Sequence, residues 1–304
     1  MDDDARGGEV SRRQLLGLGF SRLARELDAQ RALDRLASAD PQEPGESLRD
    51  AWGRPDTAGL ARRLEPVADR LVAATGVRQG ERVLDAACGD GNVALAAARR
   101  GADVTAVDFA PAALERARTR ARAEGLEVEW LEGDAHDLPA GDAWFDRSLS
   151  AFGVTWAEDS RTAIDELLRV TRPEGTVGIA TWSRGGFFGG LLMLAFEHGL
   201  LRAADPGYWG REAPLRDELE PLCETVDFEA HRLPLELSSP EEAWELMAGS
   251  PGPIAAGIDV LPDDRRESLR EAAIELAARH GADRGEVEVN WLEVVATMPE
   301  GDPI

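Results

Sequence analysis

The chain has 304 residues, of which 43% are hydrophobic and 30% are charged. This composition excludes an intrinsically disordered chain, and the length suits one large domain with insertions or two smaller domains. The 58 acidic residues outnumber the 34 basic ones and give a formal net charge of −24, which disfavours a nucleic-acid partner unless arginines gather locally.

Lysine is absent from the sequence, because all 34 basic residues are arginine. This excludes Schiff-base chemistry on a lysine and the phosphate-binding lysine of a P-loop. Two cysteines, Cys88 and Cys223, could form one disulfide, but two reduced thiols are the simpler interpretation. No metal site is predicted, and no apolar run approaches the roughly 18 residues that span a membrane.

Residues 1–56 are predicted to form an N-terminal helical extension followed by a linker. Arg12 and Arg13 precede an apolar stretch, as in a twin-arginine export signal, but charged residues interrupt that stretch before it reaches the roughly 7–15 residues required. Apolar residues at helical spacing, Phe20 among them, instead predict an amphipathic docking helix. The protein is therefore expected to be cytoplasmic.

Residues 57–183 alternate between helical and strand patterns and predict one α/β core. Short apolar strands that alternate with helices of this length predict a doubly wound, Rossmann-like fold whose mostly parallel sheet is covered on both faces. Ligands of such folds bind beyond the carboxyl ends of the strands. In chain order the predicted elements are a helix over 58–74, a strand over 82–86, a helix over 92–101, a strand over 102–108, a helix over 111–124, strands over 126–131 and 144–150, a helix over 161–171 and a strand over 176–182.

The stretch after this core, residues 184–225, is predicted to be a helical lid. It combines glycine pairs with bulky apolar side chains, which suits a flexible cover over a hydrophobic substrate. The same side chains could equally complete the core or a dimer contact, so a homodimer is an alternative use of this segment. Side chains of the N-terminal segment could close the pocket from the other side. The candidate lid residues are Phe20, Trp52, Phe187, Phe188, Tyr208 and Trp209.

Residues 226–304 are predicted to complete the sheet with closing strands and cap helices. The stretches 225–237 and 286–298 alternate in the manner of half-exposed antiparallel strands. Between them, helices are predicted to start at Pro240 and near Pro262, since proline suits the first turn of a helix.

Carboxylates and glycines gather at the ends of the predicted strands. Asp85 ends the first strand and is followed by Gly89 and Gly91, Asp108 ends the second strand, and Asp134 follows the third. Glycines let a ligand approach the backbone, and a helix N-terminus offers free N–H groups. A ligand site is one interpretation of this pattern, and tight turns with helix-capping aspartates are the alternative.

The charge of the first loop helps to identify its ligand. The motif "GDGNVA" satisfies the dinucleotide fingerprint, and Asp108 lies near the distance at which that fingerprint has its ribose-binding acid. However, Asp85 and Asp90 would repel a pyrophosphate in a partly desolvated site. A nucleoside that carries a sulfonium and an ammonium group but no phosphate would be attracted, which favours S-adenosylmethionine over NAD.

Five motifs in register give the sequence a resemblance to a known family. The motifs are "VLDAACGDGNVAL", "VTAVDFAPAALERAR", "GDAHDLP", "FDRSLSAFGVTW" and "ELLRVTRPEGTVGIATW". Together they resemble the class I S-adenosylmethionine-dependent methyltransferases over residues 57–183, in particular the small-molecule group that includes the quinone C-methyltransferases. The resemblance implies a seven-stranded sheet with an antiparallel closing strand.

The resemblance also implies a role for each residue of the cofactor site, with Ala87 standing where the family usually has its first loop glycine. The loop after the first strand would lie against the methionine part, and the later strand ends would bind the nucleoside. The implied cofactor-binding residues are Asp85, Ala87, Cys88, Gly89 and Gly91 for the methionine part, Asp108 for the ribose, Phe109, Asp134 and Ala135 for the adenine, and Ser150 near the amino group.

The function predicted from these features is methyl transfer to a small, hydrophobic acceptor at carbon or oxygen. Displacement at a methyl group activated by positive sulfur requires alignment and exclusion of water, and a catalytic base is optional. His136 is a candidate base, with a surface or helix-capping histidine as the alternative. An NAD(P)-dependent oxidoreductase and a non-enzymatic S-adenosylmethionine-binding protein are the other functions that the sequence leaves open.

Overall fold

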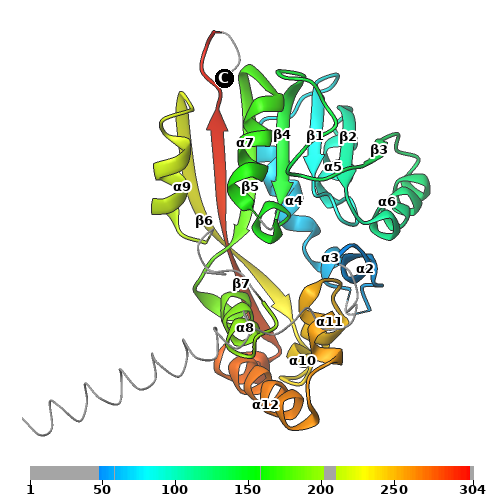
Figure 1. Ribbon diagram of the computed structural model, residues 1–304, viewed down its shortest axis with the longest axis vertical. Helices are drawn as coiled ribbons and strands as arrows, with labels where there is room; N and C mark the ends of the chain where they lie inside the picture. Colours follow the sequence, from blue (N-terminus) through cyan, green and yellow to red (C-terminus); the bar gives the residue numbers. More distant parts are fainter. Residues whose placement is uncertain (1–47, 58, 158, 202–209, 302–304) are drawn as a thin grey trace, which may run out of the picture. The chain divides into compact units, whose positions relative to one another are not determined.

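The computed structural model describes residues 48–57, 59–157, 159–201 and 210–301 (Figure 1). All of them belong to one compact unit, Glu46–Ile304. The predicted N-terminal docking helix with Phe20, and the lid candidates Tyr208 and Trp209, lie outside the described residues. None of the helices in the described part of the chain has the length and apolar character that a membrane-spanning helix needs.

A seven-stranded sheet forms the centre of this unit, with the strand order β3-β2-β1-β4-β5-β7-β6. Neighbouring strands from β3 to β5 are parallel, whereas β7 runs antiparallel to both β5 and β6. The prediction of a mostly parallel sheet with an antiparallel closing strand is therefore confirmed. The strands are β1 (Arg82–Ala86), β2 (Asp103–Asp108), β3 (Glu129–Glu132), β4 (Phe145–Ala151), β5 (Thr171–Trp182), β6 (Thr225–Glu236) and β7 (Glu286–Thr297).

Helices cover both faces of the sheet, as the sequence predicts. They are, in chain order, α2 (Leu48–Gly53), α3 (Leu60–Arg63), α4 (Glu65–Ala74), α5 (Asn92–Ala98), α6 (Pro111–Glu124), α7 (Ser160–Val170), α8 (Gly186–Glu197), α9 (Glu212–Leu219), α10 (Glu242–Gly249), α11 (Pro253–Asp259) and α12 (Asp263–Arg279). Val83 of β1 packs into the apolar cluster that contains Leu71 of α4, whereas Leu84 packs into the cluster that contains Leu167 of α7. Because side chains alternate between the two faces of a strand, a strand that is apolar on both faces needs helices on both.

Two helical regions differ from the sequence-based prediction. The predicted helix over 58–74 is two helices, α3 and α4, and Pro66 stands in the first turn of α4. Proline has no N–H to continue a preceding helix but is well accommodated where a new one starts. Helix α11, which begins at Pro253, was not predicted, since its seven residues are too few to show a helical period.

The segment predicted as a lid divides between two places. Helix α8 contacts β7 and α12, and Figure 1 shows α8, α10, α11 and α12 gathered at the end of the sheet to which β4 points. Helix α9 instead contacts β6, and its Leu215 and Leu219 are fully buried in the same apolar cluster as Leu167. Helix α9 therefore belongs to the layer that covers the sheet, and only α8 lies where a lid would lie.

Gly178, in the middle of β5, marks a close approach of helix and sheet. A Cβ at this position would lie 2.5 Å from Thr75 Cγ2 and 2.7 Å from Leu149 Cδ2. We expect Gly178→Ala to lower the free energy of unfolding by about 1–3 kcal/mol, because the added methyl group over-packs the core. Urea denaturation measures this change, with Gly141→Ala as the control, since a Cβ at Gly141 would meet no atom within 4 Å. Equal unfolding midpoints for the two variants would contradict this packing.

Candidate functional site

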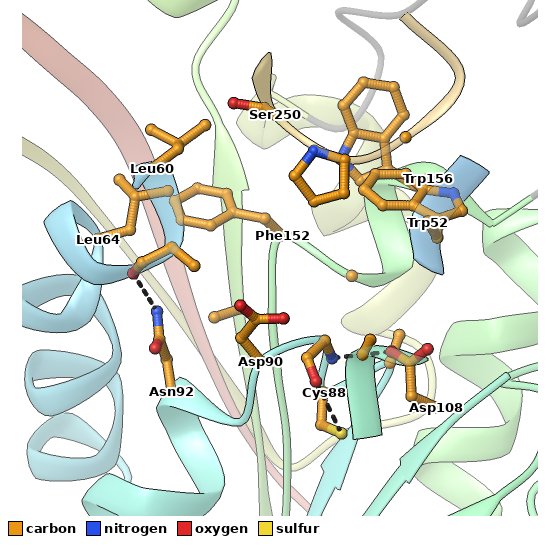
Figure 2. A pocket seen from close by; sticks show the side chains of 18 of the residues that line it. Trp52, Leu60, Leu64, Cys88, Asp90, Asn92, Asp108, Phe152, Trp156 and Ser250 are labelled. Atoms are coloured by element: carbon orange, nitrogen blue, oxygen red, sulfur yellow. Dashed lines mark hydrogen bonds between the residues drawn. The ribbon is translucent and has the colours of Figure 1, made fainter. Parts of the chain in front are cut away.

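A cavity of about 360 Å³ opens at the carboxyl ends of β1, β2 and β4 (Figure 2). Strand ends and the loops after them line one part of it, and residues of the surrounding helices, among them α2, α3, α8 and α10, and of the connection between α10 and α11 line the rest. The chain leaves β1 toward β2 on one side and later returns to place β4 on the other side of β1. The cavity thus lies at the point where the strand order reverses, which is where doubly wound folds bind their ligands.

The loop from β1 into α5 contains three residues with a left-handed backbone. Ala87, Gly89 and Gly91 have φ angles of 51°, 52° and 81°. A Cβ at Gly91 would lie 2.7 Å from the Trp130 ring, so this glycine is required by packing as well as by its backbone conformation. A Cβ at Gly89 would meet no atom within 4 Å, and Gly89 lines the cavity. Gly89 therefore presents bare backbone to open space, where a ligand can approach it.

Ala87 adopts a backbone conformation that usually requires glycine, and Gly153 makes room for its methyl group. A Cβ at Gly153 would lie 2.6 Å from Ala87 Cβ and 2.9 Å from Ser150 Oγ. The loop after β4 therefore packs directly on the loop after β1. The alanine that stands where a glycine is expected is matched by a glycine on the neighbouring loop.

Asp85 and Asp108 anchor the first loop with hydrogen bonds. Asp85 Oδ2 accepts from the Ala94 backbone N–H in α5 at 2.9 Å, and Asp108 accepts from the backbone N–H groups of Gly89 and Ala110, both at 2.8 Å. Both aspartates also line the cavity, although they are only 2% and 6% exposed. The two interpretations that the sequence leaves open, a capping role and a ligand site, are therefore compatible in this geometry.

Burial disfavours the ionised form of the Asp85 and Asp108 carboxyl groups. Burial raises the pKa of Asp85 to about 8, and the charge of Asp108 adds to the increase. Burial likewise raises the pKa of Asp108. It also raises the pKa of the Cys88 thiol well above its usual range, together with the charges of the two aspartates. A cationic ligand would be stabilised at this end of the cavity, and Cys88 is not a thiolate nucleophile at neutral pH.

Asp90 has a cationic partner that the sequence does not reveal. Arg116 of α6 donates to Asp90 Oδ1 and to the Gly53 carbonyl oxygen, each at 2.9 Å. This ion pair offsets the charge of Asp90, so the repulsion of a pyrophosphate that the sequence predicts from Asp90 is weakened. The pair also ties the first loop to α2 and α6.

Asp134 and His136 form a hydrogen-bonded pair at the edge of the cavity. Asp134 Oδ1 accepts from the His136 backbone N–H at 3.0 Å and lies 2.6 Å from His136 Nδ1. The Asp159 backbone N–H donates to His136 Nε2 at 3.1 Å. This pattern fits a neutral imidazole with its proton on Nδ1. Because both ring nitrogens are engaged, the geometry favours the capping alternative for His136 over a catalytic base.

Three of the predicted site residues in the described part of the chain do not line the cavity. Gly91 serves the turn, as described above. Ser150 is fully buried. Its hydroxyl donates to the Ala86 carbonyl oxygen at 2.9 Å and accepts from the Val154 backbone N–H at 3.3 Å, and the bond to Ala86 fixes β4 against β1. Phe187 is fully buried against Phe188. The predicted residues that do line the cavity are Trp52, Asp85, Ala87, Cys88, Gly89, Asp108, Phe109, Asp134, Ala135, His136 and Phe188.

Five aromatic side chains, which the sequence did not predict to lie together, form an aromatic wall along the other part of the cavity. They are Trp52, Phe152, Trp156, Trp182 and Phe188. Phe152, Trp182 and Phe188 stack in series, with successive ring centroids 3.8 Å and 4.6 Å apart. Trp52 and Trp156 meet edge to face at 5.2 Å. Phe152 and Trp156 follow β4 closely, so their position after a predicted strand end is the signal that could have identified them. Trp182 looks like an ordinary strand residue in the sequence and offers no such signal.

Ser250 places a hydroxyl group in these apolar surroundings. Its Oγ is buried and has no hydrogen-bond partner among the described residues. The loop that carries it is held by packing, since Gly252 has a φ of 125° and a Cβ there would lie 3.0 Å from the Trp52 ring. Figure 2 shows Ser250 and the Trp52–Trp156 pair on one side of the cavity and Cys88, Asp90 and Asp108 on the other. A buried hydroxyl without a partner costs free energy that a ligand could recover.

The cavity thus joins two chemically different parts. The polar part contains Asp85, Gly89 and Asp108 and suits a cation with hydrogen-bond donors. The apolar part contains the aromatic wall and Ser250 and suits a flat apolar group with one polar atom. Two ligands that react with each other could therefore meet at the boundary.

Comparison with known proteins gives the site a family context. The methyltransferase domain family matches residues 83–175. An uncharacterized protein of Mycobacterium tuberculosis is 42% identical over 169 residues, which make up 54% of this chain and 62% of that protein. The malonyl-(acyl-carrier protein) O-methyltransferase of Serratia marcescens is 35% identical over 148 residues, 49% of this chain and 56% of that enzyme. The match therefore spans less than two thirds of the length of these relatives.

A solved structure resembles this chain over most of its length. The phosphoethanolamine N-methyltransferase 2 of Haemonchus contortus, solved with phosphomonomethylethanolamine and S-adenosylhomocysteine, superposes with a TM-score of 0.55. The superposition covers 84% of this chain and 60% of that one at 18% sequence identity. At this identity the likeness concerns the fold.

Proposed function

We propose that this chain is a class I S-adenosylmethionine-dependent methyltransferase, and that it transfers a methyl group from S-adenosylmethionine to a small hydrophobic acceptor at carbon or oxygen. One observation carries the proposal: the buried aspartates Asp85 and Asp108 and an aromatic wall line the same cavity. The aspartates suit a cationic nucleoside, and the wall suits a hydrophobic acceptor.

The polar part of the cavity fits S-adenosylmethionine, the cofactor of this family. Its sulfonium and ammonium groups supply the positive charge that favours the ionised form of the buried Asp85. Asp108 would accept hydrogen bonds from the ribose hydroxyls, and Phe109 and Ala135 would contact the adenine. The open space beside Gly89 leaves room for the ligand against bare backbone.

The chain's own residues contribute binding, orientation and the exclusion of water. The bound cofactor supplies a methyl carbon that its positive sulfur already activates. Asp85 and Asp108 would hold the cofactor through its charges and hydroxyls, and the aromatic wall would hold the acceptor in line and keep water out. Because both ring nitrogens of His136 are engaged, we propose an acceptor whose carbon or oxygen is nucleophilic without a proton transfer to His136.

The sheet topology supports a methyltransferase over a nicotinamide oxidoreductase. Dinucleotide-binding folds of the doubly wound type have parallel strands in the order 3-2-1-4-5-6. Here β7 is inserted between β5 and β6 and runs antiparallel to both. The charge of Asp90 does not distinguish the two functions as clearly, because Arg116 pairs with Asp90 and offsets that charge.

The direct test of the function measures binding and transfer separately. Calorimetry should detect S-adenosylmethionine and S-adenosylhomocysteine, and a labelled methyl group should pass to members of a panel of small hydrophobic phenols and ketones. Binding without transfer to any acceptor would favour a binding protein over an enzyme. A protein that binds neither cofactor form would contradict the proposal as a whole.

Asp108→Asn tests the assignment of the ribose site. We expect the variant to bind S-adenosylmethionine about 10–150-fold more weakly, because it loses charge-assisted hydrogen bonds worth about 1.5–3 kcal/mol. Calorimetry measures the affinity. Asp103→Asn is the matched control, since Asp103 lies at the exposed start of the same strand, and it should bind as the native protein does. Native affinity in Asp108→Asn would show that the ribose lies elsewhere.

The raised pKa of Asp85 predicts that cofactor affinity increases with pH. At pH 7 a carboxyl group with a pKa of about 8 is mostly protonated, and it becomes a carboxylate as the pH rises. Only the carboxylate attracts a sulfonium, so affinity should increase about tenfold between pH 7 and pH 9. The amino group of the ligand titrates in the same range, so Asp85→Asn is the control, because it keeps the ligand's titration and removes that of Asp85. Identical pH profiles for the two proteins would rule out this role.

Ser250 is proposed to recognise a polar atom of the acceptor. The native protein should prefer p-cresol over p-xylene by about 2–10-fold, because the phenol hydroxyl supplies the partner that Ser250 Oγ lacks. Ser250→Ala should remove this preference and leave the S-adenosylmethionine affinity unchanged. Equilibrium dialysis with the two probes measures the preference. If the variant keeps it, another group discriminates between the probes.

A further inference from the structure

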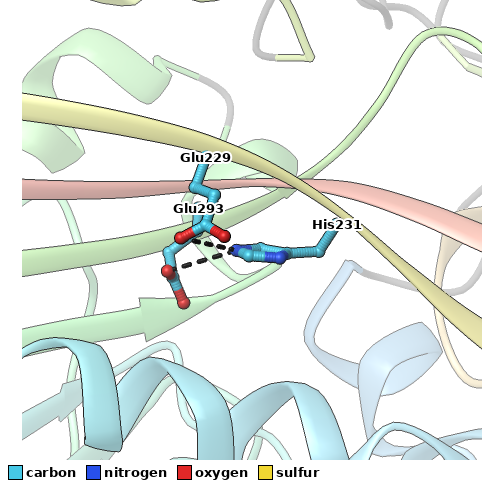
Figure 3. A group of neighbouring side chains, drawn as sticks. All are labelled: Glu229, His231 and Glu293. Atoms are coloured by element: carbon cyan, nitrogen blue, oxygen red, sulfur yellow. Dashed lines mark hydrogen bonds and ion pairs between the residues drawn. The ribbon is translucent and has the colours of Figure 1, made fainter.

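A second group of ligand-forming side chains lies outside the cavity, where β6 pairs with β7 (Figure 3). Glu229 of β6 stands directly opposite Glu293 of β7 in the antiparallel register, and His231 lies two residues further along β6, on the same face. His231 Nε2 lies 3.2 Å from Glu293 Oε1 and 3.7 Å from Glu229 Oε2. One donor atom of each residue lies within 4.8 Å of the other two.

Two carboxylates in directly opposite positions repel each other, and one of these is buried. Glu293 is 3% exposed, and its Oε2 has no hydrogen-bond partner in the described part of the chain. Like charges opposite each other on neighbouring strands destabilise a sheet, and a buried charge needs a partner. The arrangement therefore favours a bound cation.

Arg70 of α4 provides positive charge at this place in the structure. Its Nη2 donates to Glu229 Oε2 at 2.8 Å, its Nε donates to His231 Nε2 at 2.9 Å, and Nε lies 3.7 Å from Glu293 Oε2. Since His231 Nε2 accepts a hydrogen bond from Arg70, it carries no proton, and its lone pair could bind a metal ion if Arg70 moved away. The Arg70 side chain is 44% exposed, so it can move into solvent without opening the core.

We propose that Glu229, His231 and Glu293 form a binding site for a divalent transition-metal ion of the zinc type, and that Arg70 competes with the metal for it. Zinc binds imidazole and carboxylate at about 2.0–2.2 Å, which sets ligands of a tetrahedron roughly 3.4 Å apart. The distances of 3.2 Å and 3.7 Å from His231 to the two carboxylates lie on either side of this value. The His231 ring is already oriented, because it packs on Trp291 with centroids 4.5 Å apart.

The proposed metal site is separate from the proposed methyl transfer. None of its three ligand residues lines the cavity, and neither does Arg70. A bound ion would bridge β6 to β7 and release Arg70, so its effect is expected on the stability of this strand pair. The test can therefore be read without measuring any methyl transfer.

Zinc calorimetry on the full chain, stripped of metal with a chelator, tests the proposal. We expect one zinc ion per chain at this site, and an affinity at least about tenfold higher in Arg70→Ala, because the competing cation is gone. The same binding should be lost in His231→Gln and in Glu293→Gln, which remove a ligand and keep the side chain similar in size. Circular dichroism establishes that each variant is folded.

His198→Gln is the control for adventitious binding to histidine. His198 Nδ1 contacts the Leu194 carbonyl oxygen at the end of α8, away from the cluster, and its loss should leave the zinc affinity unchanged. Zinc affinity that does not increase in Arg70→Ala, or that survives in His231→Gln, overturns the proposal. So does the absence of zinc binding in both the native protein and Arg70→Ala.

Discussion

The hydrogen bonds of two buried aspartates hold the loop between β1 and α5, and the candidate site depends on them. Asp85 accepts from the backbone of α5, and Asp108 accepts from Gly89 and Ala110. The same carboxyl groups line the cavity and are short of positive charge because of their burial. One pair of side chains thus shapes the loop and attracts a cationic ligand to it, so the turn and the binding site cannot be altered independently.

The apolar part of the cavity comes from segments that are far apart in the chain. Trp52 precedes the core, Phe152 and Trp156 follow β4, and Ser250 and Gly252 lie between α10 and α11. Their packing is specific, since a Cβ at Gly252 would crowd the Trp52 ring and Gly153 leaves space for the Ala87 methyl group. The unpartnered Ser250 hydroxyl stands out here because the surroundings are otherwise aromatic and aliphatic. Such a surface can bind apolar groups without a fixed orientation, and the Ser250 hydroxyl adds one hydrogen bond that orients the ligand.

Arginine gives this acidic chain its local balance of charge. In a chain of 58 acids without lysine, Arg116 neutralises Asp90 at the cavity and Arg70 lies among Glu229, His231 and Glu293 on the strand pair β6–β7. A guanidinium can reach several oxygen atoms at once, which suits both clusters. The pair of Arg116 and Asp90 offsets the charge of Asp90, so this charge does not by itself select the ligand of the cavity. Among Glu229, His231 and Glu293 the fold holds the Arg70 guanidinium, and this is where we propose that a metal ion competes with it.

The sequence alone determined the α/β class, the order of the core elements and the position of Asp85, Gly89 and Asp108 at strand ends, because hydrophobic periodicity and glycine turns are local properties. Only the tertiary structure decided that Ser150 binds the Ala86 carbonyl, that Arg116 reaches Asp90, and that Ser250 lines the same cavity as the aromatic wall. Glu229 and His231 lie beside Glu293 because of the register of β6 and β7. A shift of β6 by one residue would turn its side chains to the other face of the sheet. Contacts between distant residues depend on such registers and on packing, and neither leaves a periodic pattern in the chain.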